Sequence, residues 1–174
     1  MSIDKPMLDY AMELIKEGYY ILPVHGVVNG KCTCKKPDCD RQGKHPLNRN
    51  GSHGASNDSE IIKSWWKQWP YANIAAATGK ESGLLILDID PKNKGFESLK
   101  KLEQHNGALE SNRIVETGSG GLHYHFCYPT DYNIGNKQNF AGYSGLDIRG
   151  NGGYAVMPPS NHISGEKYKW KRKD

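Results

Sequence analysis

Long apolar segments are missing from this sequence of 174 residues. None of its hydrophobic runs approaches the ~18 residues that a transmembrane helix needs. Its first residues, MSIDKP, lack the apolar stretch of a secretory signal peptide, and no internal repeat is visible. We therefore expect a cytoplasmic protein that does not bind membranes.

The composition also lacks the features of a disordered chain. Charged residues make up 24% of the sequence and hydrophobic residues 36%, and 20 residues are glycine. These proportions are typical of a globular domain with many loops. A chain of this length suffices for one domain with a hydrophobic core but not comfortably for two. We therefore expect residues 1–174 to form a single domain.

Cysteine is scarce, but its placement is informative. Three of the four cysteines lie with a histidine inside a polar loop spanning residues 31–57, and the four residues are Cys32, Cys34, Cys39 and His45. In a cytoplasmic protein such a cluster favours metal binding over disulfide formation. Three thiolates and one imidazole suit a structural zinc site, and a polar loop of this length needs some such crosslink.

Alternatives to this zinc site stay open. The Cys-x-Cys spacing is tighter than that of most zinc sites, and His25 or His53 would be the fourth ligand if His45 joined Lys44 in binding phosphate. The thiols would otherwise be free in a mobile loop. The remaining cysteine, Cys127, lies in a strand-like segment and is expected to be a small core residue.

Hydrophobic periodicity predicts a mixed α/β (α+β) fold. The segments with helical spacing are 6–18, 58–70 and 95–105. The short apolar segments typical of strands are 19–24, 73–78, 83–89, 113–117, 122–128, 146–149 and 154–158. Because strands outnumber helices and several are joined by hairpin-length turns, we expect a mixed central β-sheet with flanking helices.

The segment GLLILDIDPKN, residues 83–93, carries the first chemical signal. Asp88 and Asp90 are two residues apart at the end of an apolar strand, so their side chains point to one face. Two carboxylates at this spacing repel each other unless a positive charge lies between them. The pattern therefore indicates a cation site.

A third carboxylate, Asp147, stands in the strand-like run Leu-Asp-Ile-Arg. If it lies beside Asp88 and Asp90, the three acids would suit two divalent ions, ~3.5–4 Å apart, that act on a phosphoryl group. A single aspartate at a strand end is more simply a solvated turn residue. Only the convergence of all three would support the site.

Candidate phosphate-binding groups occur in the same part of the chain. The turn GSGG contains Ser119 and Gly120 and would offer a hydroxyl and unhindered N–H groups. His123 and His125 follow at strand period and share a face. Arg149 ends the Leu-Asp-Ile-Arg run, where it would neutralise a triphosphate. Glycine turns and half-buried strand histidines are, however, common without such a role.

In this order, the motifs Asp-x-Asp, Gly-Ser-Gly-Gly-x-His and Leu-Asp-Ile-Arg-Gly resemble those of the archaeo-eukaryotic primase superfamily. The resemblance is to the primase–polymerase (Prim-Pol) domain at the N-terminus of plasmid and phage replication proteins. It extends to the flanking segments GKHP, WWKQWPYANIAAATG and GGYAVMPPSNHISGEKYKW. It implies an archaeo-eukaryotic primase-like (RRM-like) catalytic core that is the N-terminal part of a longer replication protein.

The resemblance also implies an activity, that of a DNA primase and DNA polymerase. Such an enzyme joins a nucleotide from an NTP or dNTP to a 3′-hydroxyl on a DNA template and releases pyrophosphate. The implied ligands of two Mg²⁺ or Mn²⁺ ions are Asp88, Asp90 and Asp147. The implied phosphate-binding residues are Ser119, Gly120 and His123, with Arg149, Lys44 and His125 as weaker candidates. The implied partners are template and primer DNA, together with a helicase domain or protein.

Two other functions stay open. His123-Tyr124-His125 has the His-hydrophobe-His pattern of replication-initiator endonucleases that nick DNA with a tyrosine, for which Tyr143 or Tyr154 would be the nucleophile. That function leaves the Asp-x-Asp motif without a role. A zinc-containing single-stranded DNA-binding module would instead use Trp and Tyr residues for base stacking. It leaves the carboxylates unexplained, because they repel phosphate unless metal ions intervene.

The net charge of +4 arises at the C-terminal end. Residues 1–166 contain 18 cations and 18 anions, whereas the last segment, KYKWKRKD, holds five cations and one anion. Cations that alternate with Tyr168 and Trp170 suit contact with a nucleic-acid backbone. An amphipathic edge strand would show the same alternation, so both interpretations stay open.

Overall fold

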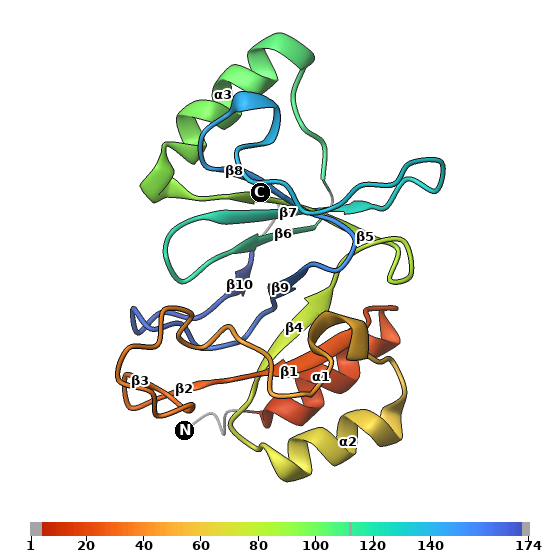
Figure 1. Ribbon diagram of the computed structural model, residues 1–174, viewed down its shortest axis with the longest axis vertical. Coiled ribbons are helices and arrows are strands. Elements are labelled where there is room, and N and C mark those ends of the chain that lie inside the picture. The colour runs from red at the N-terminus through yellow and green to blue at the C-terminus, as the bar shows by residue number, and fades with distance from the viewer. Residues whose placement is uncertain (1–4, 112, 172–174) are drawn as a thin grey trace.

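The computed structural model describes residues 5–111 and 113–171, which form three α-helices and three β-sheets (Figure 1). The helices are α1 (Met7–Lys16), α2 (Ser59–Gln68) and α3 (Gly95–Asn106), and the 3₁₀ helices are η1 (Gly51–Gly54), η2 (Pro91–Asn93) and η3 (Phe140–Gly142). The strands are β1 (Ile21–Val24), β2 (Val27–Val28), β3 (Lys31–Cys32), β4 (Asn73–Ala77), β5 (Leu84–Ile89), β6 (Arg113–Glu116), β7 (Leu122–Cys127), β8 (Leu146–Arg149), β9 (Tyr154–Val156) and β10 (Lys169–Trp170). None of the helices in these ranges has the length and apolar character needed to cross a membrane.

The larger sheet has the strand order β10-β6-β7-β5-β8, and each neighbouring pair is antiparallel. Because side chains alternate between the two faces of a strand, β5 contributes to two different clusters. Leu87 and Ile89 pack with Leu99 of α3. Leu84 and Ile86 point to the opposite face and pack with residues of the smaller sheet.

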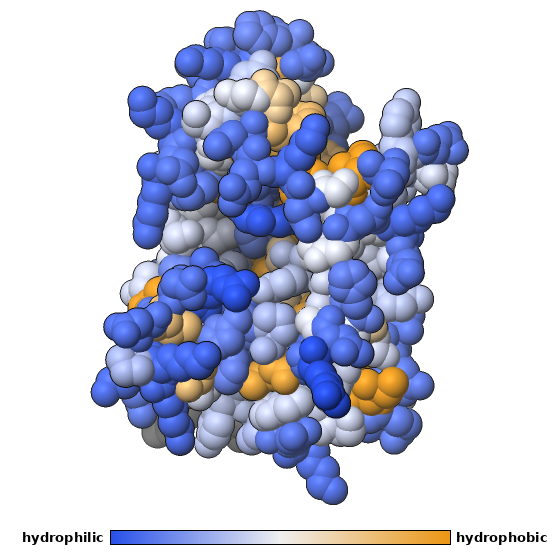
Figure 2. All heavy atoms as spheres, viewed as in Figure 1, coloured by the Kyte–Doolittle hydropathy of each residue, from blue (hydrophilic) through white to orange (hydrophobic). Residues whose placement is uncertain are grey.

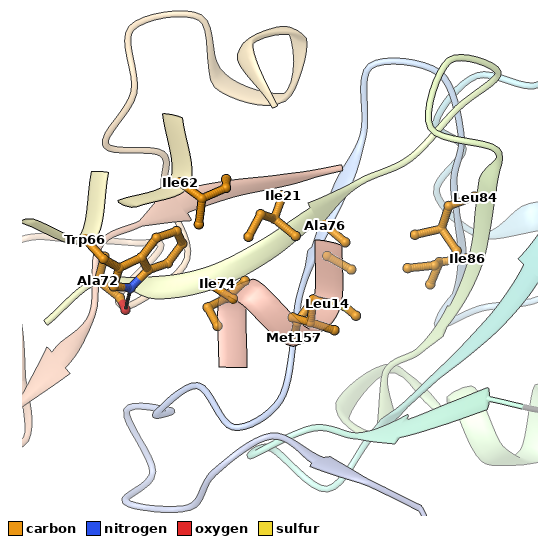
Figure 3. Close-up of a cluster of buried hydrophobic side chains, with 12 residues drawn as sticks. Leu14, Ile21, Ile62, Trp66, Ala72, Ile74, Ala76, Leu84, Ile86 and Met157 are labelled. Carbon is orange, nitrogen blue, oxygen red and sulfur yellow. Dashed lines mark hydrogen bonds between the residues drawn. The ribbon is translucent and has the colours of Figure 1, made fainter. Parts of the chain in front are cut away.

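The smaller of the two main sheets has the order β1-β4-β9, and α1 and α2 cover one of its faces. The third sheet is the antiparallel pair β2-β3. Asp58 caps α2, since its side chain accepts hydrogen bonds from the N–H groups of Glu60 and Ile61. The cluster beneath the two helices is drawn in Figure 3 and includes Leu14, Ile21, Ile62, Trp66, Ile74 and Met157. Burying large apolar side chains of this kind stabilises the fold by about 1.5–3 kcal/mol each.

The opposite face of the smaller sheet lies against the larger sheet. Leu22, Ala75 and Val156 pack with Val115 of β6 and with Tyr168. The two sheets are therefore layered between α1 and α2 on one outer side and α3 on the other (Figure 1). The face seen in Figure 2 is mostly hydrophilic and is hollowed between the part that holds the larger sheet and the part that holds the smaller one.

The cations and aromatics of the C-terminal segment lie on opposite sides of the chain. Tyr168 is buried, and Trp170 is half-buried against the core. The exposed residues between and beside them are Lys167, Lys169 and Lys171. The two rings therefore belong to the core and are not free to stack on bases. This arrangement is that of an amphipathic edge strand. Residues 172–174 of this segment lie outside the described residues.

The predicted mixed α/β fold with flanking helices is confirmed, but its single central sheet was wrong. The predicted strands near 19–24, 73–78 and 154–158 form the smaller sheet, separate from the others. Strand-like patterns predict which segments are extended but do not say which strands pair. The archaeo-eukaryotic primase-like core and the extent of the single domain stay predictions.

A buried asparagine joins three segments of the fold. The side chain of Asn73, which is 1% exposed, donates from Nδ2 to the carbonyl oxygens of Gly43 at 2.9 Å and of Asn161 at 2.8 Å. Its Oδ1 accepts from the N–H of Asn161 at 3.0 Å. Because these bonds use both Nδ2 protons and the oxygen, they fix the cysteine loop and the segment after β9 to the start of β4.

Replacing Asn73 by alanine should destabilise the protein strongly. The substitution leaves the peptide groups of Gly43 and Asn161 without their partners, and an unpaired buried polar group costs about 1–3 kcal/mol. We expect the free energy of unfolding, measured with urea, to fall by about 3 kcal/mol or more. Asn106→Ala is the control, because it removes an exposed side chain that bonds only to the Leu102 carbonyl of its own helix. An equal loss in both variants would contradict this role of Asn73.

Candidate active site

The register of the larger sheet sets three polar side chains in a row. Asp88 of β5 pairs with His123 of β7 on one side and with Asp147 of β8 on the other. Directly opposed residues of antiparallel strands point to the same face, with Cβ atoms about 4.5–5.5 Å apart. Two residues earlier on that face, Ile86 lies between His125 and Arg149. The register thus brings Asp147 beside Asp88.

A cavity of about 400 Å³ opens over this row. The carboxylates that line it are Asp40, Asp88, Asp90 and Asp147, so all three predicted acids are among them. The cations that line it include Lys44, Lys92 and Arg149. A second compartment of about 300 Å³ shares Asp88, His123 and Arg149 with the first and reaches Tyr154 of the smaller sheet. The cavity therefore lies between the two sheets and places acids and cations together.

Arg149 bridges two of the three acids. Its Nη2 donates to Oδ2 of Asp88 at 2.8 Å and lies 3.3 Å from Oδ2 of Asp147. The other oxygen of Asp147 accepts from the N–H of Asn139 at 3.0 Å. The side chains of Asp88 and Asp147 are only 22% and 21% exposed, so water screens their repulsion incompletely. The pair is therefore arranged to hold positive charge between its carboxylates.

Asp90 has a structural task in addition to lining the cavity. It lies just beyond β5 and caps η2, accepting from the N–H of Lys92 at 2.9 Å and from Nδ2 of Asn93 at 2.7 Å. Among the described residues, the group of His, Cys, Asp and Glu ligand atoms that lie within 4.8 Å of one another is the cysteine cluster. The three acids therefore share a cavity without gathering as closely as those ligands do.

The donor chemistry of the cavity fits hard divalent cations. Mg²⁺ is bound by one or two carboxylates together with water and phosphate oxygens, rather than by a closed protein cage. The cavity of about 400 Å³ offers the carboxylates of Asp88, Asp90 and Asp147, beside that of Asp40. A protein cation already lies between Asp88 and Asp147, and this shows that positive charge is favourable there.

His123 forms a buried wall of the cavity. Its Nε2 is 3.6 Å from Oδ1 of Asp88, and its buried Nδ1 has no hydrogen-bond partner among the described residues. Burial lowers the pKa of His123, and the neighbouring Asp88 carboxylate acts in the opposite direction. Both effects follow from the position of the ring, which lies buried beside one of the three acids.

The turn between β6 and β7 presents Ser119 to the cavity. The N–H of Gly120 donates to the Thr117 carbonyl at 2.9 Å, and the N–H of Gly121 donates to Oγ1 of Thr117 at 2.9 Å. Two of the N–H groups expected to bind phosphate are thus used within the turn. Gly120 lines a neighbouring groove instead, so this geometry lends no support to its predicted role.

Lys44 reaches the cavity from the cysteine loop. Its side chain is half-buried, and burial lowers the pKa of Lys44, while the nearby Asp88 carboxylate acts in the opposite direction. A lysine that is partly removed from water forms stronger ion pairs with phosphate than an exposed one. The GKHP segment therefore supplies a cation to the same cavity as the three acids.

The sequence analysis did not assign several of the residues that line the cavity, among them Arg41, Lys92 and His162. Lys92 follows Asp90 by two residues, which is a local signal that was present. His162 comes from a segment without a recognisable chemical motif, and it is placed by tight packing against Gly118, where an added Cβ would lie 2.2 Å from the Cβ of His162. No sequence pattern predicts the contact between His162 and Gly118.

His125 does not line the acidic cavity. Its Nδ1 lies 3.1 Å from the hydroxyl of Tyr19, and the ring also meets Trp170 edge-on. It borders a different cavity, near the start of β5. Although His123 and His125 share a face of β7, the strand carries them to separate cavities. The predicted role of His125 in nucleotide binding therefore lacks geometric support.

The residues of the nicking hypothesis are also dispersed. The hydroxyl of Tyr143 lies 3.0 Å from Nδ1 of His105 on α3, away from the acidic cavity. Tyr154 lines the second compartment, next to Arg149. A nickase needs two histidines that share one metal ion and face a tyrosine, and His123 and His125 border separate cavities. Asp88, Asp90 and Asp147, by contrast, line the same cavity.

The cysteine loop forms a compact cluster that could hold a metal ion, made of Cys32, Cys34, Cys39 and His45. Sγ of Cys39 is 3.8 Å from Nδ1 of His45, and the N–H of Gly43 donates to Sγ of Cys32 at 3.4 Å. The ring of His25 packs on that of His45, but its Nδ1 is hydrogen-bonded with Oγ1 of Thr33. Neither His25 nor His53 belongs to the cluster, so the geometry favours His45 as the fourth ligand.

The chain matches a known protein family over residues 11–174. The family is described as bifunctional DNA primase/polymerase, N-terminal (Prim-Pol). No curated protein matches the chain. The matched range contains the acidic cavity and the cysteine cluster, so both lie within the family's own domain.

Purified protein should contain about one zinc ion per chain. Cys34→Ser and Cys39→Ser should lose the ion and lower the melting temperature, because each removes a ligand whose metal crosslinks a polar loop. Metal content and thermal unfolding measure both effects. Cys127→Ser is the control, since Cys127 lies apart from the cluster and is exposed on β7, which corrects the prediction that it is a core residue. Metal-free wild-type protein with the same melting temperature as the zinc-loaded form would refute the site.

His125 should make the fold sensitive to acid. Burial first, and then the neighbouring His123 and Arg113, lower the pKa of His125 to about 3. The unfolded chain binds a proton below pH 6.5 and the folded chain does not, so stability falls as the pH falls from 6.5 toward 3. Between pH 7.5 and pH 5 this residue should cost about 2 kcal/mol. In His125→Gln the difference between the two pH values should shrink by that amount.

The control for the acid experiment is His105→Gln, which removes an exposed histidine. Its unfolding free energy, measured with urea at both pH values, should change with pH as in the wild type. If His125→Gln also keeps the wild-type pH dependence, the buried ring is not the source of acid sensitivity.

Proposed function

The chain belongs to the bifunctional DNA primase/polymerase (Prim-Pol) N-terminal family, and from this premise we propose that it transfers nucleotides to the 3′-end of a strand on a DNA template. Family membership points to a DNA primase/polymerase nucleotidyltransferase in general. The proposal adds the residues that do the work and the class of mechanism.

One observation supports the proposal above the others. Asp88 and Asp147 lie side by side in the sheet with a cation between them, over a cavity that also contains Asp90. A DNA-binding module without catalysis has no use for half-buried carboxylates, because they repel phosphate. A nucleotidyltransferase needs them, because they offset the charge of the ions that phosphoryl transfer requires.

We assign Asp88, Asp90 and Asp147 as the residues that would hold two ions of Mg²⁺ or Mn²⁺. Held there, such ions would supply the positive charge that offsets the negative charge developed during phosphoryl transfer. The protein's part is positional. The antiparallel register fixes Asp88 and Asp147 as neighbours, and the cap that Asp90 forms on η2 holds its carboxylate at the cavity edge.

The cations of the cavity are assigned to the triphosphate of the incoming NTP or dNTP. Arg149, Lys44 and Lys92 surround the acids, and a guanidinium that now bonds to carboxylates is equally suited to phosphate oxygens. Ser119 and His123 each offer one further donor. These residues bind and orient the phosphates, so that the 3′-hydroxyl of the primer meets the α-phosphate and pyrophosphate leaves.

The substrates and partners follow from this assignment. Template and primer DNA are needed for the reaction, and NTPs and dNTPs supply the nucleotide. We also propose that the domain works beside a helicase, as a domain of the same protein or as a separate one. The zinc assigned to the cysteine loop would be structural, because its four ligands leave no position open for substrate.

Loss of the paired acids should abolish nucleotide incorporation. Asp88→Ala/Asp90→Ala removes two of the three assigned ligands, and we expect the rate of extending a labelled primer on a DNA template to fall by at least about 10³-fold. The assay contains dNTPs with Mg²⁺ or Mn²⁺, and a lane without primer tests synthesis from the first nucleotide. Asp131→Ala, which removes an exposed carboxylate outside the cavity, should extend the primer at the wild-type rate. Persistent extension in the double variant would refute the assignment.

A further inference from the structure

A second groove lies beside the acidic cavity, on the other side of the β6–β7 turn. It has a volume of about 400 Å³ and is lined by the turn, by Phe96 at the start of α3 and by the lysines that flank and belong to β10. Thr117 borders both the groove and the acidic cavity. Ser119 lines the cavity and Gly120 lines the groove, so the tip of the turn separates the two.

The walls of the groove combine positive charge with one exposed aromatic ring. Lys167, Lys169 and Lys171 are all exposed, because the residues that alternate with them turn inward. Phe96 is 44% exposed, although it is a large apolar residue. Lysines along a groove that also presents an aromatic face are the pattern by which proteins bind single-stranded nucleic acid.

The charge of the whole chain favours an anionic partner at this place. Because residues 1–166 are balanced, the net charge of +4 arises in the segment that begins at Lys167, and three of its five cations, Lys167, Lys169 and Lys171, line the groove. Two glutamates, Glu116 and Glu166, also line the groove, beside its three lysines. Glu166 pairs with Lys169 at 3.2 Å, but both side chains are more than half exposed, and such a surface pair is weak enough for a phosphate to replace it.

The turn itself permits close approach. Gly120 has a φ of +83°, and nothing lies within 4 Å of the position that its Cβ would occupy. A strand that follows the groove therefore meets no side chain at Gly120 itself before it reaches Ser119 at the cavity. Any residue with a Cβ would be strained at this φ and would narrow the passage.

From these observations we propose that the groove formed by Phe96, the β6–β7 turn and Lys167–Lys171 binds a single-stranded segment of DNA that leads to the acidic cavity. The inference rests on the proposed function, because only a polymerase would need template DNA to pass from this groove to the acidic cavity. The lysines contact phosphates, and Phe96 stacks on a base.

The test is binding of a fluorescent single-stranded oligonucleotide, followed by anisotropy over a range of salt concentrations without added nucleotide or divalent metal. Lys169→Ala/Lys171→Ala should weaken binding roughly tenfold at 0.1 M salt and should reduce the slope of log affinity against log salt by about 1.4, which corresponds to two phosphate contacts. Lys100→Ala/Lys101→Ala is the matched control, because it removes the same charge from the exposed side of α3.

Phe96→Ala separates stacking from charge. It should weaken binding of the single strand about fivefold or more, leave the salt slope unchanged, and leave binding of a blunt duplex unaffected. Ile61→Ala is its control, since Ile61 is 42% exposed on α2, away from the groove. Wild-type binding by the lysine variant, or equal losses in the variant and its control, would overturn the proposal.

Primer extension at saturating DNA distinguishes this inference from the proposed function. If the wild type extends primers and the groove variants bind DNA normally, the groove assignment alone is wrong. If the groove variants lose binding but the wild type incorporates no nucleotide with either metal, the groove is supported and the polymerase function fails. A wild type that binds no DNA at low salt would overturn the groove and count against the function as well.

Discussion

The candidate site depends on the side-chain alternation of one strand, β5. Leu84 and Ile86 pack toward the smaller sheet, and Asp88 points to the same face where the cavity opens. The two apolar residues fix the register, because a slip by one position would turn Asp88 and Ile86 together toward α3 and would bring Leu87 and Ile89 to the cavity face. The neighbours of Asp88 then follow from pairing alone, with His123 on one side and Asp147 on the other. The hydrophobic core thus sets the geometry of the charged site.

Charge balance explains why such a site is stable without a ligand. Half-buried carboxylates side by side would repel each other strongly, and Arg149 relieves this repulsion by bonding to both. The same guanidinium is assigned to the triphosphate. A substrate that brings its own cations would release Arg149 from the acids and at the same time offer it phosphate oxygens. On substrate binding, Arg149 would then exchange carboxylate partners for phosphate oxygens, and the ions would take its place beside the acids. No buried charge would be left without a partner, so the free-energy cost of rearranging the site would be low.

The parts of the site that were predictable from sequence are those governed by short-range periodicity. The spacing of Asp88 and Asp90 predicts a shared face, and the spacing of the cysteines with His45 predicts a metal cluster that the structure brings together. The division into two sheets was not predictable, because strand patterns do not specify partners. The presence of His162 in the cavity was not predictable either, because it depends on close packing against Gly118. The predicted role of His125 lacks geometric support for a related reason. A shared face of a strand does not imply a shared cavity when other side chains, here Tyr19 and Trp170, cover part of that face.

A metal ion in the cysteine loop would also affect the acidic cavity. The loop is polar and contributes little to the core, so hydrophobic burial cannot hold Lys44 at the cavity. His45 belongs to the metal cluster and its neighbour Lys44 lines the cavity, so a metal held by His45 would limit the positions that Lys44 can take. The carbonyl of Gly43 is fixed in turn by Asn73, which also anchors the segment that carries His162. Two loops without cores of their own are thus tied to the start of one buried strand, β4, and through it to the sheet that faces the acids.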